Sequence, residues 1–270
     1  MAEALIKESG WEIWHDWNAR TMRPITTWFC EAIRAAPGQT VLDVACGTGI
    51  PALAVAERVA PNGKVVATDV SAAMLGSAER VAKARGVENI EHREMDGMKL
   101  DFPDASFDAV TSKDGIIFCA DPVEAVRELR RVLKPGGRFA VSAWGEPAKC
   151  PFFTTMFGPV GKALNRPPPD PQNPGPFRFA APGEFERVLR AGGFTDFEIR
   201  ECEVYFEFDS LDDHWRSTSA MAAPVEQANA TLPPAELAAL KQTIADALKP
   251  FVVEGRIRVP NVAQCASGRR

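Results

Sequence analysis

The 270 residues, 46% hydrophobic and 25% charged, have the composition of a folded globular protein. A formal net charge of −5 argues against a nucleic-acid partner, because such proteins neutralise phosphates with a basic excess or a basic face. No apolar run approaches the roughly 20 residues of a membrane span. The six cysteines include no CxxC pair, so we expect reduced thiols in a cytoplasmic protein, with neither disulfides nor a metal site.

The chain opens with an aromatic helical segment. Residues 2–36 are predicted to be helical, carry Trp11, Trp14 and Trp17, and end at Pro37-Gly38. Trp14 and Trp17 lie three residues apart on one helix face. The tryptophans therefore either dock these helices onto the core or line an apolar pocket.

Alternating strands and helices follow. Short buried strands are predicted at 41–45, 64–68, 90–94, 107–112 and 138–143. Helices are predicted at 50–60, after an N-cap at Ser71 as far as 85, and from a capping box at Asp121 to 133. The turn Lys134-Pro-Gly-Gly137 is expected to lead into the fifth strand. This alternation predicts βαβ units and a mostly parallel sheet of the α/β class.

The C-terminal half is less regular. The proline-rich stretch 166–176 is compatible with neither a helix nor a central strand. Beyond it we expect a helix at 182–191, a long strand within 194–208, helices at 211–221 and 234–248, and a last strand at 256–265. The two late helices are expected to form an insertion that covers the active site, without a second autonomous domain.

A glycine-rich turn joins the first strand to the first helix after it. Gly47 and Gly49 would present backbone N–H groups and a positive helix end to a ligand. Asp69, 20 residues after Gly49, ends the next strand, where a carboxylate can accept both hydroxyls of a ribose. The stretch Gly47 to Ala52 also satisfies the G-x-G-x-x-A fingerprint. Taken alone, the turn fits a nicotinamide or flavin enzyme nearly as well as other nucleotide enzymes.

Asp43 distinguishes between these classes of nucleotide enzyme. It lies within the first strand, four residues before Gly47, where its carboxylate can receive the ammonium of an amino-acid moiety directly or through a water. A pyrophosphate would be repelled by a carboxylate in that place. The turn is therefore better suited to a nucleotide that carries an amino acid.

Four motifs in register carry a family resemblance: Val41-Leu-Asp-Val-Ala-Cys-Gly-Thr-Gly49, Val66-Ala-Thr-Asp-Val-Ser71, Phe107-Asp-Ala-Val110 and Leu129-Arg-Arg-Val-Leu-Lys-Pro-Gly-Gly137. From residue 39 to residue 144 the chain resembles the class I S-adenosylmethionine-dependent methyltransferases, especially the menaquinone and ubiquinone biosynthesis branch. The resemblance implies a doubly wound, Rossmann-like fold with a seven-stranded, mostly parallel sheet and one antiparallel strand near its C-terminal edge. It implies a single domain 1–270, with a helical lid 1–38, a cofactor-binding core 39–145, and substrate-covering insertions and final strands 146–270.

The resemblance also implies a cofactor site for S-adenosylmethionine. The residues around the methionine part would be Asp43, Gly47, Thr48 and Gly49, with a backbone contact from Lys113. Asp69 would bind the ribose, and the residues near the adenine would be Val70, Met74, Asp96, Gly97 and Met98. The glycines could instead serve a tight turn only, Asp96 could cap a turn, and Met74 and Met98 could be core residues.

Methyl transfer from a sulfonium is an in-line displacement, and a base is needed only if the nucleophile arrives protonated. His15 in the aromatic segment and His214 in the late insertion are candidate bases, although each could be structural. Asp114, just past the fourth strand, could orient a substrate hydroxyl or amine, or cap the segment after it. The stretch 114–118 departs from the quinone branch, which argues against a quinol acceptor.

We expect a small, apolar or aromatic acceptor between the N-terminal helices and the late insertion. The opposite wall is expected from Phe118, Trp144, Phe152, Phe153 and Phe157, with residues 166–176 either restricting the entrance or forming an exposed linker. The expected protein is a monomer or homodimer whose partner is this acceptor, with no nucleic acid and no membrane span. Two alternatives remain: an NAD- or FAD-dependent oxidoreductase, and a non-catalytic regulatory protein that binds the cofactor.

Overall fold

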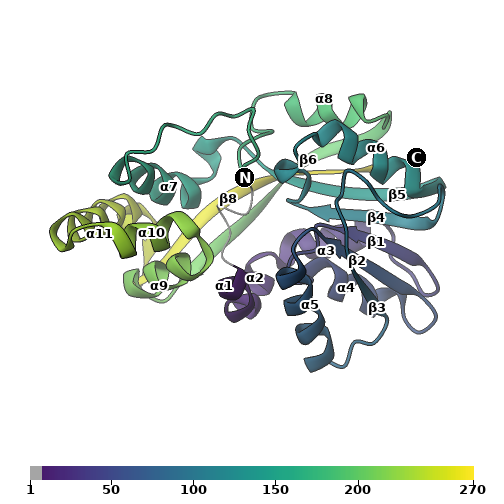
Figure 1. Ribbon diagram of the computed structural model, residues 1–270, viewed down its shortest axis with the longest axis horizontal. Coiled ribbons are helices and arrows are strands. Elements are labelled where there is room, and N and C mark those ends of the chain that lie inside the picture. Colours follow the sequence, from purple (N-terminus) through teal and green to yellow (C-terminus); the bar gives the residue numbers. More distant parts are fainter. Residues whose placement is uncertain (1–7) are drawn as a thin grey trace.

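A twisted sheet with the strand order β3-β2-β1-β4-β5-β8-β6 runs through the molecule (Figure 1). The computed structural model describes residues 8–270. All the strands of this path run parallel except β8, which is antiparallel to both of its neighbours. A two-residue strand, β7 (Val252–Val253), pairs with β8 beside the path. The expected seven-stranded, mostly parallel sheet is thus confirmed, with β7 as an addition. The strand bounds are β1 Thr40–Val44, β2 Lys64–Asp69, β3 Ile90–Glu94, β4 Phe107–Lys113, β5 Leu133–Trp144, β6 Asp196–Phe208 and β8 Arg256–Arg269.

Helices cover both faces of the sheet, as the alternation of elements predicts. On one face α3 (Arg23–Ala32) packs against α4 (Ile50–Val59), and on the other α6 (Pro122–Val132) packs against α8 (Glu184–Ala191) (Figure 1). A further helix, α5 (Ala72–Ala84), contacts β2 and β3. The central strand β1 is almost wholly buried between these layers, which explains why Val41, Leu42 and Val44 are apolar.

The helix ends follow their sequence signals. The side chain of Ser71 accepts a hydrogen bond from the backbone N–H of Met74 at the start of α5, and Gly86 adopts a φ of 68° just beyond its end. The carboxylate of Asp121 accepts hydrogen bonds from the N–H groups of Val123 and Glu124 at the start of α6. Both caps are therefore confirmed.

The segment Lys134 to Gly137 is not a turn outside the sheet. It lies within β5, where Leu133 already pairs with Phe107 and the register shifts before Arg138 pairs with Ala109. Gly136 takes a φ of 76°, which lets the extra residues bulge while the ladder continues on both sides. Propensity alone could not show that Leu133 finds a partner.

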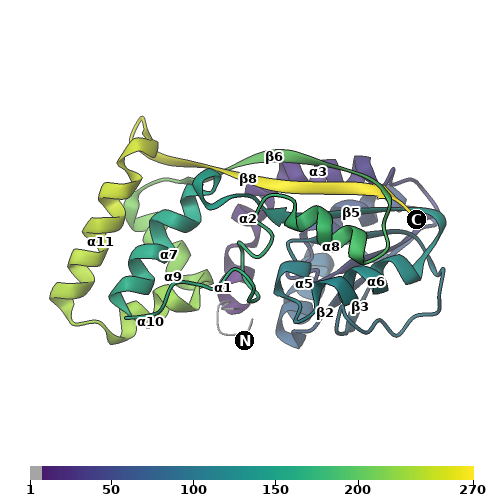
Figure 2. The ribbon, with the colours of Figure 1, turned by 90° about the horizontal axis from the view of Figure 1, so that it is seen from above.

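The strands β6 and β8 form a long antiparallel pair that leaves the sheet and reaches a separate group of helices (Figures 1 and 2). This helical lobe consists of α7 Pro151–Ala163, α9 Leu211–Met221, α10 Ala223–Thr231 and α11 Pro234–Leu248. The sequence predicted α9 and α11 but not α7 or α10. The first contains Gly158, Pro159 and Gly161, and the second follows α9 with Pro224 in its first turn, so both lack a clear helical signal. Within residues 8–270, short 3-10 helices also lie at Ile116–Phe118, Pro147–Lys149 and Lys249–Phe251.

The aromatic N-terminal segment forms three helices, α1 (Glu8–Ile13), α2 (His15–Thr21) and α3, so its helical prediction is confirmed from residue 8 onward; residues 1–7 lie outside the described part. Figure 2 places α1 and α2 between the helical lobe and the sheet domain, and α1 contacts both α5 and α9. Trp17 stacks against Phe206, and its indole N–H donates to the carbonyl of Glu207 at 2.7 Å. Among residues 8–270 no helix is long and apolar enough to cross a membrane.

Candidate active site

A cavity of about 1330 Å³ opens at the carboxyl ends of the parallel strands, the edge at which open α/β sheets bind ligands. Its floor is formed by the residues that follow β1, β2 and β4. Side chains of α1, α2, α7 and α9 and the proline-rich segment 166–176 form the walls. The cavity therefore lies between the sheet domain and the helical lobe.

The glycine turn forms one end of this floor. Gly47 and Gly49 take φ values of 55° and 84°, which glycine adopts without strain. A Cβ on Gly47 would meet no atom within 4 Å, so the turn leaves open space at this point of the cavity wall. A Cβ on Gly49 would lie 3.2 Å from the Cβ of Ala78, and this glycine serves close packing against α5. Of the two, Gly47 alone lines the cavity.

Asp69 ties the end of β2 to this turn. One carboxylate oxygen accepts a hydrogen bond from the N–H of Gly47 at 2.9 Å, and the other accepts from the N–H of Ser71 at 3.0 Å. The side chain lines the cavity although the residue is only 9% exposed. A carboxylate at this place in the cavity lining is an acceptor for ligand hydroxyls as well as for the N–H groups of the turn.

The residues expected near an adenine border the cavity next to Asp69. Val70, Met74, Asp96, Gly97 and Met98 all line it. The isopropyl group of Val70 is unusual because the residue is 67% exposed, whereas most apolar side chains of the chain are buried. The carboxylate of Asp96 accepts a hydrogen bond from the N–H of Met98 at 2.9 Å. An exposed aliphatic side chain and a carboxylate in the same cavity lining can offer a flat apolar ring a contact face and a hydrogen-bond acceptor.

Asp43 lies behind the turn, outside the cavity lining. It is fully buried; one carboxylate oxygen accepts a hydrogen bond from the Thr111 hydroxyl at 2.7 Å, while the other has no partner among the described residues. Burial raises the pKa of this carboxyl to about 7, against the lowering effects of Thr111 and Lys113. A buried carboxylate with an unused acceptor beside a ligand site fits a role toward a cationic group.

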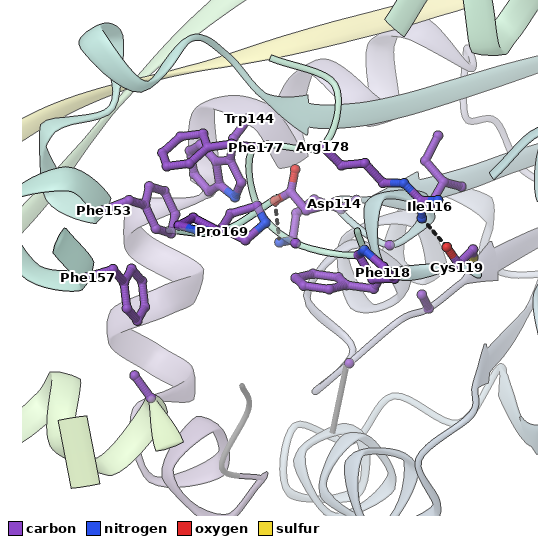
Figure 3. A pocket seen from close by; sticks show the side chains of 18 of the residues that line it. Asp114, Ile116, Phe118, Cys119, Trp144, Phe153, Phe157, Pro169, Phe177 and Arg178 are labelled. Carbon is purple, nitrogen blue, oxygen red and sulfur yellow. Dashed lines mark hydrogen bonds and ion pairs between the residues drawn. The ribbon is translucent and has the colours of Figure 1, made fainter. Parts of the chain in front are cut away.

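At the end of β4, Asp114 presents a carboxylate to the middle of the cavity (Figure 3). One of its oxygens accepts from the Ser142 hydroxyl at 2.7 Å, and the other pairs with the ammonium of Lys113 at 3.2 Å. Its backbone takes a φ of 55°, a conformation that costs about 1–3 kcal/mol outside glycine and that often occurs at functional sites. The surroundings therefore fix the direction of this carboxylate.

The two candidate histidines do not line the cavity. Nδ1 of His15 forms a 3.0 Å hydrogen bond with the Thr48 hydroxyl, so this imidazole packs on the glycine turn. His214 lies 4.8 Å from the ring of Phe208, and its burial lowers its pKa to about 4. Both positions favour a structural over a basic role, because neither imidazole reaches the space where a substrate would bind.

Aromatic side chains line the half of the cavity away from the glycine turn. Figure 3 shows Trp144, Phe153 and Phe157 on one side and Phe118 on the other, with Asp114 between them. The five aromatic residues expected as this wall all line the cavity. Trp11 and Trp17 line it as well, whereas Trp14 packs edge-on against Trp17. The tryptophans thus both dock the helices and border the cavity.

The proline-rich segment is a wall of the cavity and not a free linker. The N–H of Gly175 donates to the carbonyl of Ile117 at 3.2 Å, and the guanidinium of Arg178 donates to the carbonyls of Cys119 and Ala120. Sequence reasoning missed Arg178, together with Asn18 and Met22 on the N-terminal helices, which also line the cavity. The sequence showed that residues 166–176 cannot form a helix. It carried no signal that this segment attaches to the loop after β4.

Comparisons with known proteins agree with this geometry. The model of the ubiE/COQ5 methyltransferase family matches residues 13–158, more than half of the chain. A demethylmenaquinone methyltransferase of Geobacillus stearothermophilus is 34% identical over 172 residues, 60% of this chain and 74% of that protein. One of Thermus thermophilus is 46% identical over 121 residues, 45% of this chain and 54% of that protein.

Solved structures share the fold. The BH2331 protein of Bacillus halodurans, solved as a proposed methyltransferase, superposes with a TM-score of 0.61 at 21% identity, covering 90% of this chain and 97% of that one. A geranyl diphosphate C-methyltransferase of Streptomyces coelicolor gives a TM-score of 0.53 at 15% identity, over 93% and 80% of the two chains. At these identities the likeness is one of fold alone.

Proposed function

The chain belongs to the ubiE/COQ5 methyltransferase family, and from this membership and the cavity we propose that it methylates a hydroxylated aromatic ring of an apolar acceptor. It is an S-adenosylmethionine-dependent methyltransferase with a class I, Rossmann-like fold. The family decides between the two interpretations of the glycine turn in favour of S-adenosylmethionine over a nicotinamide or flavin nucleotide. The acceptor and the roles of individual residues are proposals.

The residues at the glycine-turn end of the cavity fit S-adenosylmethionine. Open space at Gly47, the carboxylate of Asp69 and the exposed side chain of Val70 correspond to the methionine, ribose and adenine parts. Thr48, Asp96 and Lys113 also line this end, and the unpartnered oxygen of Asp43 lies behind it. Gly49 would act by shaping the turn. When bound, S-adenosylmethionine supplies an electrophilic methyl group on a sulfonium; the protein has to orient the acceptor and exclude water.

The single observation that carries the acceptor proposal is the position of Asp114 in an otherwise apolar half of the cavity. A small-molecule pocket usually measures about 300–1,000 Å³, so a cavity of about 1330 Å³ has room for the cofactor and an acceptor together. Aromatic side chains on both sides of Asp114 suit a flat ring. The carboxylate suits a ring hydroxyl, from which it accepts a hydrogen bond or a proton.

The relatives name a specific candidate. The two curated proteins are demethylmenaquinone methyltransferases, so we take a reduced, hydroxylated naphthoquinone ring as the first acceptor to test. Loss of the ring hydroxyl proton to Asp114 raises the electron density of the ring and its reactivity toward an electrophile. Ser142 and Lys113 hold the carboxylate in place during this step. The departure at 114–118 argued against a quinol; the carboxylate of Asp114 at the cavity wall supports a ring hydroxyl as the group that it would contact.

The test is methyl transfer from radiolabelled S-adenosylmethionine to a reduced demethylmenaquinone with a short side chain, measured for the native protein and for Asp114→Asn. The asparagine keeps the shape but cannot take a proton, and we expect a rate loss of about 10²-fold or more. Asp170→Asn, in the proline-rich wall, is the matched control and should keep the native rate. Transfer at the native rate by Asp114→Asn would contradict the proposed role. A native protein that binds the cofactor and methylates no hydroxylated ring would contradict the acceptor class and favour the regulatory alternative.

A cytoplasmic location, a monomeric or homodimeric state and the lack of a nucleic-acid partner stay predictions of the sequence. Size-exclusion chromatography with light scattering measures the second.

A further inference from the structure

The N-terminal helices present one stripe of side chains to the glycine turn and the cavity. Trp11, His15, Asn18 and Met22 are spaced by four, three and four residues, and therefore lie on one helix face. Backbone hydrogen bonds from Trp14 to Gly10, Asn18 to Trp14 and Met22 to Asn18 keep the helical turns continuous across the helix boundaries. His15 contacts Thr48 of the glycine turn, and the other three members line the cavity.

Three members of this stripe carry a polar group without a hydrogen-bond partner in residues 8–270: Nε2 of His15, which lies outside the cavity lining, and groups of Asn18 and Trp11, which line the cavity. Asn18 is 5% exposed and lines the cavity, yet its side-chain amide has no hydrogen-bond partner in residues 8–270. The indole N–H of Trp11 is buried and likewise lacks a partner there. A buried indole N–H without a partner costs about 1–3 kcal/mol, and native proteins seldom retain one without a function.

The place of these donors restricts what they can bind. His15 and Asn18 are three residues apart, so the bond from His15 to Thr48 puts Asn18 close to the glycine turn, beside the methionine end of the proposed cofactor site. That end of S-adenosylmethionine carries an ammonium and a carboxylate. Asp43 offers an acceptor for the ammonium on the sheet side of the turn. The carboxylate needs donors, and an indole N–H can only donate.

We propose that the side-chain amide of Asn18 and the indole N–H of Trp11 bind the carboxylate of the methionine moiety, so that the N-terminal helices complete the cofactor site. The inference rests on the proposed placement of the methionine part at the glycine turn. It makes α1 and α2 part of the binding site for the amino-acid end of the cofactor, in addition to a cover over it. Ligands that lack this amino acid should then not depend on the two donors.

The test compares two ligands by titration calorimetry. S-Adenosylhomocysteine carries the amino acid, whereas 5′-methylthioadenosine keeps the adenosine and the thioether but lacks it. For Asn18→Ala we expect the affinity for S-adenosylhomocysteine to fall about tenfold or more, as for the loss of a hydrogen bond to a charged group, with the affinity for 5′-methylthioadenosine unchanged. Trp11→Phe, which keeps the ring and removes the N–H, should show the same selectivity. Asn18→Asp should weaken S-adenosylhomocysteine more than Asn18→Ala, because it sets a carboxylate against a carboxylate.

Controls separate the possible failures. Asn173→Ala alters a cavity-lining asparagine on the opposite wall and should change neither affinity. Asp69→Ala should weaken both ligands, and if it weakens neither, the placement of the cofactor is wrong. If Asp69→Ala weakens both while Asn18→Ala and Trp11→Phe weaken neither or weaken both ligands equally, only the present inference is overturned. Tighter binding of S-adenosylhomocysteine by Asn18→Asp would overturn it too, since Asn18 would then face the ammonium.

Discussion

Nδ1 of His15 and the hydroxyl of Thr48 lie 3.0 Å apart and connect two segments separated by 33 positions in the sequence. This hydrogen bond joins the N-terminal helices to the glycine turn, and both residues are at least 95% buried. Ion pairs from Glu12 to Arg80 of α5 and from Asp16 to Arg85, the residue after α5, also hold the same helices. The N-terminal helices are thus attached to the glycine turn by one buried hydrogen bond and to the region of α5 by two more exposed ion pairs.

Removal of the buried contact should loosen the lid. Thr48→Val replaces the hydroxyl by a methyl group and leaves His15 without its partner, which should lower the free energy of unfolding by about 1–3 kcal/mol. Hydrogen exchange of residues 8–21 should rise more than that of the sheet. Thr154→Val, at an exposed hydroxyl of α7, is the control. Equal exchange of residues 8–21 in Thr48→Val and the native protein would contradict the fastening role.

Asp69 should be essential for cofactor binding. Asp69→Ala removes the acceptor of the Gly47 and Ser71 N–H groups and the proposed partner of the ribose. We expect the affinity for S-adenosylhomocysteine to fall at least 10²-fold, roughly the loss of two hydrogen bonds to a charged group. Calorimetry measures the affinity, and thermal unfolding should show little of the native stabilisation by ligand. Asp101→Ala, an exposed carboxylate outside the cavity lining, should bind as the native protein does.

The buried Asp43 should lower the stability of the ligand-free protein at high pH and strengthen cofactor binding. Its folded-state pKa of about 7 lies above the usual 3.8, so its contribution to stability is complete below pH 3.8 and is lost as the pH rises through about 7. Asp43→Asn cannot ionise, and at pH 8 the ligand-free variant should be more stable than the native protein by roughly 1–4 kcal/mol. Its affinity for S-adenosylhomocysteine should nevertheless fall. Urea unfolding at pH 5 and pH 8 measures the first effect; a stability difference that does not grow with pH would refute it.

His214 should make the helical lobe sensitive to acid. Its pKa falls from 6.5 to about 4 because the imidazole is buried against Phe152 and Phe208. Its contribution to stability is therefore present above pH 6.5 and is lost as the pH falls through about 4, by up to about 3 kcal/mol. His214→Phe fits the aromatic surroundings and should lack this loss. The stability difference between the two proteins, measured by urea unfolding from pH 7 to pH 4, isolates this residue, and a constant difference would speak against it.

Local signals were strong enough to predict the sheet domain. The four motifs fix the order of strands and helices from residue 39 to residue 144, and caps such as Ser71 and Asp121 act over a few residues. In the helical lobe the signal failed, because α7 contains Gly158, Pro159 and Gly161 and is stabilised by packing against α10 and α11. Tertiary contacts override weak propensity in such a segment.

The sequence by itself determined the residue types at the glycine turn, the proposed cofactor end of the cavity. Gly47, Asp69 and Asp43 follow from backbone conformation and charge at the ends of two adjacent parallel strands, and these are local properties. Which side chains reach the cavity depended on the tertiary structure. His15 and His214 turned away into buried contacts, while Asn18 and Arg178, which no motif marks, lie at its wall. The physical reason is that orientation depends on how helices far apart in sequence pack, and helix periodicity fixes a face but not the neighbour that this face meets.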